Sequence, residues 1–582
     1  MLWTPPLVSL AESESPLMRL SIRPITRATA LRLASAGLLA AILAGGLFAY
    51  VRPTHATSTA APHATLSTIS AAGFADPLHA SASATDTTPG AQLPRGVRTL
   101  HPKHAISAAT APRGGAAALA PVTPAALGTL QSNFNGVSSL DSAVTNFGAE
   151  FEPPDQGLCV GNGFVVEPVN SAFTIYHTGG SVVAGPFNVN DLFKEGPRQF
   201  TSDPRCYFDA TTNTWFAIIL FINAKGTVGR TDLAVNSSGD PTTRWTVYQI
   251  DATDIGKHGE PSHPGCPCLG DQPLLGIDDV NLYISTNEFS ILGPQFNGAQ
   301  IYAISKAELV AGRHSIHVVH FDNLNIGGAI AFSVQPAITN GPADAEYFLS
   351  SLDLTGNGDN RLGVWAMTNR EAVAAGGIPT LSSVVITSEA YSPPPFGIQL
   401  GGQGIVLDSG DDRMQQAQFI GGSLWASLDT AFVPDGEFFP VAAAAWFKVT
   451  PHLQGQTIAG ANLDAQGYLV SDQNFLLYPA IQADSSGNAA MVFTITGPTL
   501  YPSAAYALLT SGQTTFGDVQ IAAPGTGPYS PSSTRWGDYS WAVLAPDQNS
   551  FWLATEYIPP IASQTPDGLQ NWGTCVMQVS AI

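Results

Sequence analysis

Charged residues are scarce in this 582-residue chain, where they make up 12% of the sequence. Glycine and proline are abundant by comparison, with 57 and 44 residues. This composition excludes a mainly helical protein, because glycine and proline interrupt helices and favour short strands joined by tight turns.

Basic residues are especially few in the main part of the chain. Residues 128–582 hold 14 Lys and Arg against 40 Asp and Glu, because residues 1–127 contain nine of the basic and only four of the acidic residues. An acidic protein repels phosphate groups, so nucleic acids and anionic membrane surfaces are excluded as partners. Cations and neutral polymers remain candidates, and the acidity is also typical of a secreted protein that stays soluble.

The common motifs of hydrolases and nucleotide-binding proteins are missing. The sequence contains no Gly-x-Ser-x-Gly, His-Glu-x-x-His or Gly-x-Gly-x-x-Gly motif in a supporting context. A function therefore has to be sought in residues that only the fold brings together.

The N-terminus has the pattern of an export signal. Four arginines, Arg19, Arg23, Arg27 and Arg32, precede an uncharged apolar stretch over 33–51, and small residues follow it. We interpret residues 1–56 as a signal peptide or, alternatively, as an N-terminal membrane anchor, because 19 apolar residues just span a bilayer. Both alternatives place the main part of the chain outside the cytoplasm.

Residues 57–126 are rich in Ala, Ser, Thr, Pro and Gly and show no sustained alternation of apolar and polar residues. Such a segment buries too little apolar surface to offset the entropy lost on ordering. We expect a disordered linker there, followed by one domain over 127–582.

Strand-like segments recur seven times in that domain. The second strand of each predicted unit lies at 161–170, 213–221, 279–289, 345–354, 422–432, 487–496 and 549–557. Each is followed by another short strand and is preceded by an inner strand that opens on an Asp or a polar-Pro pair, such as Asp203-Pro204 or Tyr478-Pro479. This repeat predicts an all-β fold, a seven-bladed β-propeller of four-stranded antiparallel blades, with a two-sheet sandwich as the alternative.

Fourth strands are predicted for six of the units, for example over 244–250, 314–321 and 381–389. The seventh unit has no residues left for one before the last residue, Ile582. The segment 127–137, which precedes the first unit, is predicted to supply this strand and to close the ring.

Several stretches carry a family resemblance, among them PPDQGLCVG, SDPRCYFDATTNTWF and RWGDYSWAVLAPDQNSFWLATEY. They resemble a group of secreted bacterial β-propeller proteins without an established activity, which are loosely sialidase-like or BNR-repeat-like. The sialidase-like resemblance implies a Tyr nucleophile near a Glu, an Asp acid/base and three Arg that hold a carboxylate. No complete Asp-box turn is present, so the resemblance implies a fold and not a substrate.

Residues near the openings of the inner strands are the candidate catalytic residues: Asp203, Asp271, Arg413, Tyr478 and Asp538. Others near the same openings are candidate binding residues, and Trp536 and Trp541 among them are candidates for stacking on a sugar. The candidate binding residues are Arg205, Arg535, Trp536, Tyr539 and Trp541. The competing interpretation is that these positions serve the repeat by linking neighbouring blades.

Two segments are candidate metal sites. Asp408, Asp411 and Asp412 form a dense carboxylate cluster that predicts a cation site, with Ca²⁺ as the candidate cofactor. The string HGEPSHPGCPC offers His258, His263 and two cysteines, but a disulfide is favoured over a metal in an exported protein.

The five cysteines leave one thiol unpaired or paired externally. The sequence does not determine the pairing, and a bridge from Cys206 to Cys266 or Cys268 is one reasonable arrangement.

Three functions remain open. The first is a binding or scaffolding module for a glycan or an extracellular protein. The second is a glycoside- or polysaccharide-cleaving enzyme with a sialidase-like site. The third is a structural component of the cell surface without a small ligand.

Overall fold

The computed structural model describes residues 62–79, 111–113, 119–125, 130–149, 151–257, 259–530, 535–564 and 571–580. Within these ranges, no helix combines the length and hydrophobicity that crossing a membrane would require. The predicted signal peptide or anchor over 1–56 and the candidate ligand His258 lie outside the described residues.

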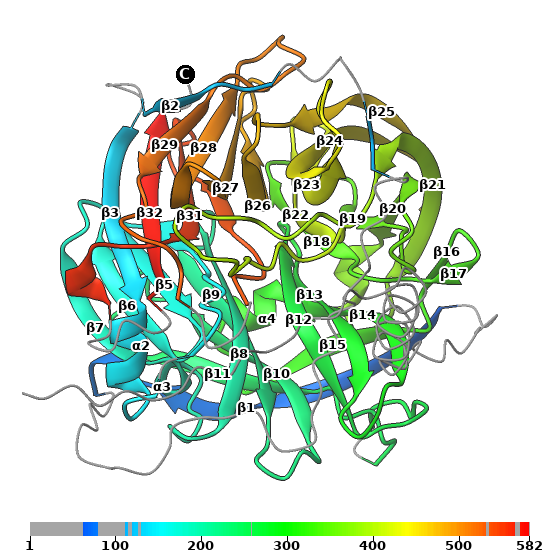
Figure 1. Ribbon diagram of the computed structural model, residues 1–582. Coiled ribbons are helices and arrows are strands. Elements are labelled where there is room, and N and C mark those ends of the chain that lie inside the picture. The colour runs from blue at the N-terminus through cyan, green and yellow to red at the C-terminus, as the bar shows by residue number, and fades with distance from the viewer. Residues whose placement is uncertain are drawn as a thin grey trace, which may run out of the picture. The chain divides into compact units, whose positions relative to one another are not determined.

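Antiparallel strands dominate the described residues and form groups of four (Figure 1). In six groups each strand pairs with the next one along the chain, and in the last group β32 pairs with β3 from the beginning of the domain. The first groups are β4 (Cys159–Gly161), β5 (Phe164–Val169), β6 (Ala172–His177) and β7 (Val182–Asn188); β8 (Phe200–Asp209), β9 (Thr214–Ile222), β10 (Gly229–Asn236) and β11 (Trp245–Asp251); and β12 (Cys268–Ile277), β13 (Asn281–Ser290), β14 (Phe296–Ser305) and β15 (Ser315–Asp322). The next are β18 (Gln335–Asn340), β19 (Glu346–Ser351), β20 (Asp359–Thr368) and β21 (Thr380–Tyr391); and β22 (Met414–Ile420), β23 (Ser423–Phe432), β24 (Val441–Gln454) and β25 (Thr457–Leu469). The last are β26 (Phe475–Ala483), β27 (Ala489–Gly497), β28 (Leu500–Leu509) and β29 (Val519–Ala523); and β30 (Trp541–Leu544), β31 (Ser550–Tyr557), β32 (Gly573–Ser580) and β3 (Leu130–Ser138).

Helices are short in the described part of the chain and lie in connections. They are α2 (Ser139–Thr145), α3 (Val189–Leu192) and α4 (Lys306–Val310), with 3₁₀ turns η1 (Pro77–His79), η2 (Arg370–Ala372) and η3 (Ile561–Ser563). A small hairpin is formed by β16 (Asn325–Ile326) and β17 (Ala329–Ile330).

The strand predictions are confirmed. The seven predicted second strands coincide with β5, β9, β13, β19, β23, β27 and β31 within three residues at either end. The predicted fourth strands over 244–250, 314–321 and 381–389 are β11, β15 and β21. The recurrence in the sequence therefore reflects a repeated local structure.

The strand predicted over 127–137 is also confirmed. It is β3, which pairs antiparallel with β32 from Leu130 opposite Val579 to Ser138 opposite Gly573. The group that contains the C-terminal strand therefore takes its outer strand from the beginning of the domain.

Neighbouring groups contact one another through their first strands, which we call inner strands. The inner strands β18 and β22 pair in parallel, with Ala337 opposite Ala417. Apolar residues of the last group, including Trp552, pack against residues of the first group such as Val165. Contacts between groups thus continue from the last group back to the first.

The expectation of a disordered linker over 57–126 is wrong for two segments. Strand β1 (His63–Ala75) pairs with the outer strands β15 and β11, and β2 (Val122–Pro124) pairs in parallel with β29. The sequence does not reveal these strands because their hydrogen-bond partners are the edges of distant strands, and such a context overrides weak local signals.

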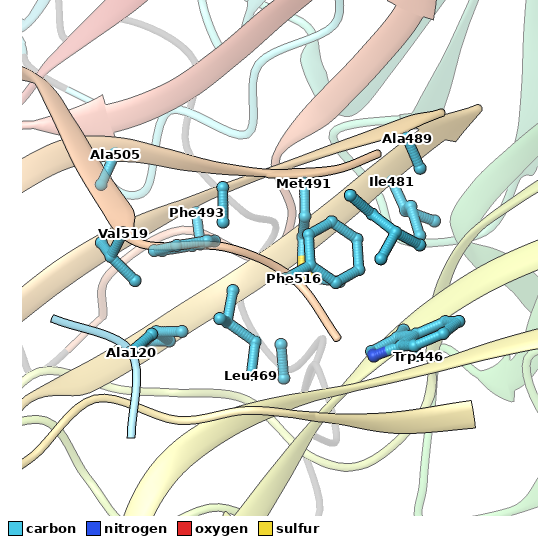
Figure 2. Close-up of a cluster of buried hydrophobic side chains, with 14 of the residues drawn as sticks. Ala120, Trp446, Leu469, Ile481, Ala489, Met491, Phe493, Ala505, Phe516 and Val519 are labelled. Atoms are coloured by element: carbon cyan, nitrogen blue, oxygen red, sulfur yellow. The ribbon is translucent and has the colours of Figure 1, made fainter. Parts of the chain in front are cut away.

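The largest apolar clusters lie between neighbouring groups. Figure 2 shows one of them, in which Trp446 and Leu469 from one group face Met491 and Phe493 from the next. The Trp446 and Phe516 rings meet edge to face, with 5.6 Å between their centres. Middle strands such as β9 and β27 are buried on both faces and are apolar nearly throughout.

Disulfides join Cys159 to Cys206 and Cys266 to Cys268, while Cys575 is a buried free thiol. The suggested bridge from Cys206 to Cys266 or Cys268 is wrong. Cys206 on β8 faces the neighbouring inner strand β4, where the Cα atom of Cys159 lies 5.3 Å away, which is a normal span for a disulfide.

Candidate functional site

Seven ionisable residues form one cluster at the inner strands, which we call the inner-strand cluster. Its members are Asp155, Asp203, Asp271, Arg413, Tyr478, Arg535 and Asp538. The five predicted catalytic candidates are all among them. The structure therefore brings these five residues together, and their catalytic role stays a prediction.

A repeated backbone irregularity presents these side chains. Asp203, Gln272 and Tyr478 have φ angles of 60°, 48° and 56°, which lie in the left-handed region. Each precedes a proline, and the pairing register of β8, β12 and β26 shifts at these points. A β-bulge redirects side chains locally, so the same defect in three inner strands turns polar residues toward the cluster.

Three carboxylates form the centre of the inner-strand cluster. Oxygen atoms of Asp155, Asp203 and Asp538 all lie within 4.8 Å of one another. Asn170 holds two of these residues, because its Nδ2 donates to Asp155 Oδ2 at 2.8 Å while its Oδ1 accepts the Asp203 amide at 2.8 Å. The three carboxylates could hold a cation or share protons.

Burial raises the pKa of Asp203 to about 6, and the neighbouring charge of Asp538 acts in the same direction. Burial likewise raises the pKa of Asp271 to about 7, with Asp203 adding to the effect and Arg413 opposing it. Buried carboxyl groups with such pKa values can exchange protons between mildly acidic and neutral pH.

Arg535 lies at the more open side of the inner-strand cluster. Its Nη2 is hydrogen-bonded to Asp538 Oδ2, and its Nη1 lies 3.9 Å from Asp408 Oδ2. The side chains of Arg535 and Asp538 are 21% and 14% exposed. Burial raises the pKa of Asp538, while Arg535 opposes this effect and favours the ionised form.

The other two arginines differ: Arg413 is paired with a carboxylate, whereas no guanidinium nitrogen of Arg205 has a hydrogen-bond partner among the described residues. Arg413 donates to both oxygens of Asp411 at 2.7 Å, from Nε and Nη2. The fully buried Arg205 lies over the rings of Tyr539 and Trp541, at 3.4 and 4.7 Å from their centres. The arginine clamp for a carboxylate that the sialidase-like resemblance implies is therefore not formed by Arg205, Arg413 and Arg535.

The prediction that Trp536 and Trp541 stack on a sugar is wrong. Both side chains have no exposed surface. Trp536 packs edge to face on Tyr529, and Tyr539 is likewise buried, with its hydroxyl donating to the Pro204 carbonyl at 2.9 Å. These aromatic residues belong to the core beneath the inner-strand cluster.

The structure does not bring the predicted metal ligands Asp408, Asp411 and Asp412 together. Asp411 is paired with Arg413, and Asp408 lies toward Arg535. Burial, Asp353 and Asp411 raise the pKa of Asp412 well above its usual value. The three carboxylates are not among the groups of described residues whose ligand atoms all lie within 4.8 Å of one another. Consecutive positions along a chain do not guarantee that their ligand atoms converge.

Sequence reasoning missed Asp155 and Glu556 as site residues. Asp155 is visible only as part of a strand opening, and Glu556 only as part of the recurring strand over 549–557. Glu556 is buried, and neither of its carboxylate oxygens has a hydrogen-bond partner among the described residues. Burial and the charge of Asp155 raise the pKa of Glu556 well above its usual value.

No family model and no curated protein matches the chain. Among solved structures, an exo-β-1,3-galactanase from Clostridium thermocellum is similar at 12% identity and a TM-score of 0.27, over 77% of this chain and 96% of that chain. A Trypanosoma rangeli sialidase is similar at 11% identity and a TM-score of 0.32, over 70% of this chain and 57% of that chain. A GH93 α-L-arabinofuranosidase from Fusarium graminearum is similar at 10% identity and a TM-score of 0.32, over 77% of this chain and 98% of that chain. At these values, the function has to be argued from the residues of the chain itself.

Proposed function

We propose that the chain is an exported glycoside-cleaving enzyme built on a seven-bladed β-propeller. The fold inference is supported by the successive groups of four antiparallel strands and by the packing of the last group against the first. Export is supported by the disulfide between Cys159 and Cys206 and by the signal-like pattern over 1–56.

The observation that carries the enzymatic proposal is the group Asp155, Asp203 and Asp538 beside Arg535. Glycoside cleavage needs one protonated and one ionised carboxyl group close together. Asp203 suits the acid, because burial raises its pKa to about 6. Asp538 suits the ionised partner, because its hydrogen bond and ion pair with Arg535 oppose the rise in pKa that burial causes, and because it is more exposed than Asp155 and Asp203.

The substrate that fits this site is a neutral glycan. Arg413 and Arg535 are already paired with Asp411 and Asp538, and Arg205 has no exposed surface, so none of the three presents an accessible, uncompensated charge to the carboxylate of an acidic sugar. Residues 128–582 hold 40 acidic and only 14 basic residues, and this net negative charge also repels anionic polymers.

The test is a turnover screen of the exported protein with neutral polysaccharides, neutral aryl glycosides and sialylated conjugates between about pH 4 and 7. We expect cleavage of a neutral substrate only, and a loss of about 100-fold or more in kcat/KM for Asp203→Asn and Asp538→Asn. The exposed Asp472 provides a matched control, since Asp472→Asn removes a carboxylate elsewhere. Unchanged turnover in both site variants would refute the assignment.

A glycan- or protein-binding module is the second candidate. Asp155 and Asp203 are only 1% and 7% exposed, and this burial limits their contact with a glycosidic bond. A glycan array and a pull-down with secreted proteins distinguish the two functions. Saturable binding without cleavage of any neutral glycan would support the binding module over the enzyme.

A further inference from the structure

A second group of ionisable side chains lies away from the inner-strand cluster, and we call it the His263 cluster. It consists of Asp254 in the loop after β11, His263 in the loop before β12, Glu288 on β13 and Asp322 at the end of β15. Glycoside cleavage at the inner-strand cluster uses none of these residues, so a role for the His263 cluster is independent of that function.

The imidazole of His263 lies among the three carboxylates. Its Nδ1 lies 2.7 Å from Glu288 Oε2 and 3.7 Å from Asp254 Oδ2, and its Nε2 lies 3.7 Å from Asp322 Oδ2. Asp254, His263 and Glu288 each offer one ligand atom, and these three atoms all lie within 4.8 Å of one another. Ligand atoms about 2.1 Å from a zinc ion lie about 3.4 Å apart in a tetrahedron, so the 3.7 Å contact with Asp254 already has nearly the span of a coordination shell. The 2.7 Å contact with Glu288 is a hydrogen bond, which a bound ion would replace.

Asp254 indicates independently that the His263 cluster can accept a further positively charged ligand. Its side chain is fully buried, and neither carboxylate oxygen accepts a hydrogen bond from any described residue. Buried carboxylates are normally paired or bound to a metal, since leaving one unpaired is costly. The three carboxylates face the imidazole of His263 and, at Asp322, that of His63, so the imidazoles cannot supply one positive charge for each carboxylate.

The neighbouring sulfur atoms do not complete the set. Cys266 and Cys268 are joined to each other, which leaves nitrogen and oxygen as the ligand atoms. The side chain of His263 lines a pocket of about 480 Å³, which gives an ion a route to the cluster. Calcium prefers oxygen ligands alone, whereas zinc accepts imidazole together with carboxylates.

We propose that Asp254, His263 and Glu288 bind a zinc-type divalent cation, with Asp322 as the carboxylate that orients the imidazole. In such sites the ring nitrogen that does not bind the metal faces a carboxylate, which fixes the ring. Asp322 is placed for this role, and it is held in turn by His63 on β1, whose Nδ1 lies 3.0 Å from Asp322 Oδ2. The metal would thus join β1, β13 and β15 through side chains.

The experiment uses the full-length protein in a non-reducing buffer after treatment with a chelator. Zn²⁺ and Co²⁺ are added, and metal content, the visible spectrum of Co²⁺ and Tm are measured. We expect one tightly bound ion per chain, a visible Co²⁺ spectrum typical of nitrogen and oxygen ligands, and a higher Tm with Zn²⁺ than with Ca²⁺.

Asp254→Asn and His263→Gln should each weaken Zn²⁺ binding at least tenfold, while the exposed control Asp472→Asn should bind as the wild type does. A wild-type protein that binds no Zn²⁺ or Co²⁺ would overturn the proposal, as would undiminished binding in both folded variants. If both variants fail to fold, the Co²⁺ spectrum and stoichiometry of the wild type decide.

Discussion

Glu167 joins the closing strand to the first group, and its replacement tests that closure. The Val137 amide of β3 donates to Glu167 Oε2 at 2.8 Å, and the Thr574 hydroxyl of β32 donates to the Val137 carbonyl at 3.0 Å. Glu167 itself lies on β5 and is fully buried. The variant Glu167→Gln keeps an oxygen that can accept the Val137 amide and removes the titratable group.

The expected effect depends on pH. Burial raises the pKa of Glu167 from 4.5 to about 7, so the folded protein binds this proton more tightly than the unfolded chain does. The stabilisation is fully present below about pH 4.5 and is lost as pH rises to about 7, which corresponds to about 3 kcal/mol. For a domain of this size, about 3 kcal/mol is roughly 3 °C in Tm.

The assay compares thermal unfolding of the wild type and Glu167→Gln at pH values from 4 to 8. The difference in Tm between variant and wild type should grow in favour of the variant as pH rises from about 4.5 to 7 and then level off. The difference in Tm between variant and wild type cancels the pH dependence that the other buried carboxyl groups cause. For the control Glu371→Gln, at an exposed residue, this difference should not change with pH. Parallel pH profiles for wild type and Glu167→Gln would refute the reasoning.

Two further predictions concern stability. Because Cys206 lies 47 positions after Cys159, replacing both by Ser should cost about 4 kcal/mol, whereas replacing Cys266 and Cys268, two positions apart, should cost about 1–2 kcal/mol. Equal losses of stability in thermal melts would contradict the loop-entropy argument. On β1, Ile69 packs against an apolar cluster while Thr68 is exposed, so Ile69→Asp should destabilise by about 1–3 kcal/mol and Thr68→Asp by less than about 0.5 kcal/mol. Equal denaturant midpoints for these two variants would show that β1 does not contribute.

The repeated strands could be predicted because each carries its own signal. The segment over 213–221 is apolar along nearly its whole length and becomes β9, which is buried throughout. Strand β1 could not be predicted, because its sequence HATLSTISAAGFA consists largely of small residues and is ordered by pairing with β15 and β11. A strand such as β9 is therefore predictable from its own sequence, whereas β1 depends on the strands beside it.

The members of the candidate site could be predicted better than their contacts. Asp203, Asp271, Arg413, Tyr478 and Asp538 are visible because they recur at strand openings. The sequence could not show that Arg413 is occupied by Asp411 or that Trp541 lies beneath Arg205. The His263 cluster was visible only in part, because Asp254, Glu288 and Asp322 come from three separate elements that pairing brings together.

The bulges explain why structural and functional interpretations of the repeat could not be separated in the sequence. A left-handed φ angle at a residue with a bulky side chain costs free energy, and such strain persists only where the surrounding fold enforces it. At Asp203 and Tyr478 the fold enforces it within the regular pairing of β8 and β26, with a proline following each residue. The same polar-Pro pair therefore marks the inner strand of the repeat and turns a polar side chain toward the inner-strand cluster. Three inner strands keep this irregularity, at Asp203, Gln272 and Tyr478, and each supplies a polar side chain near the inner-strand cluster.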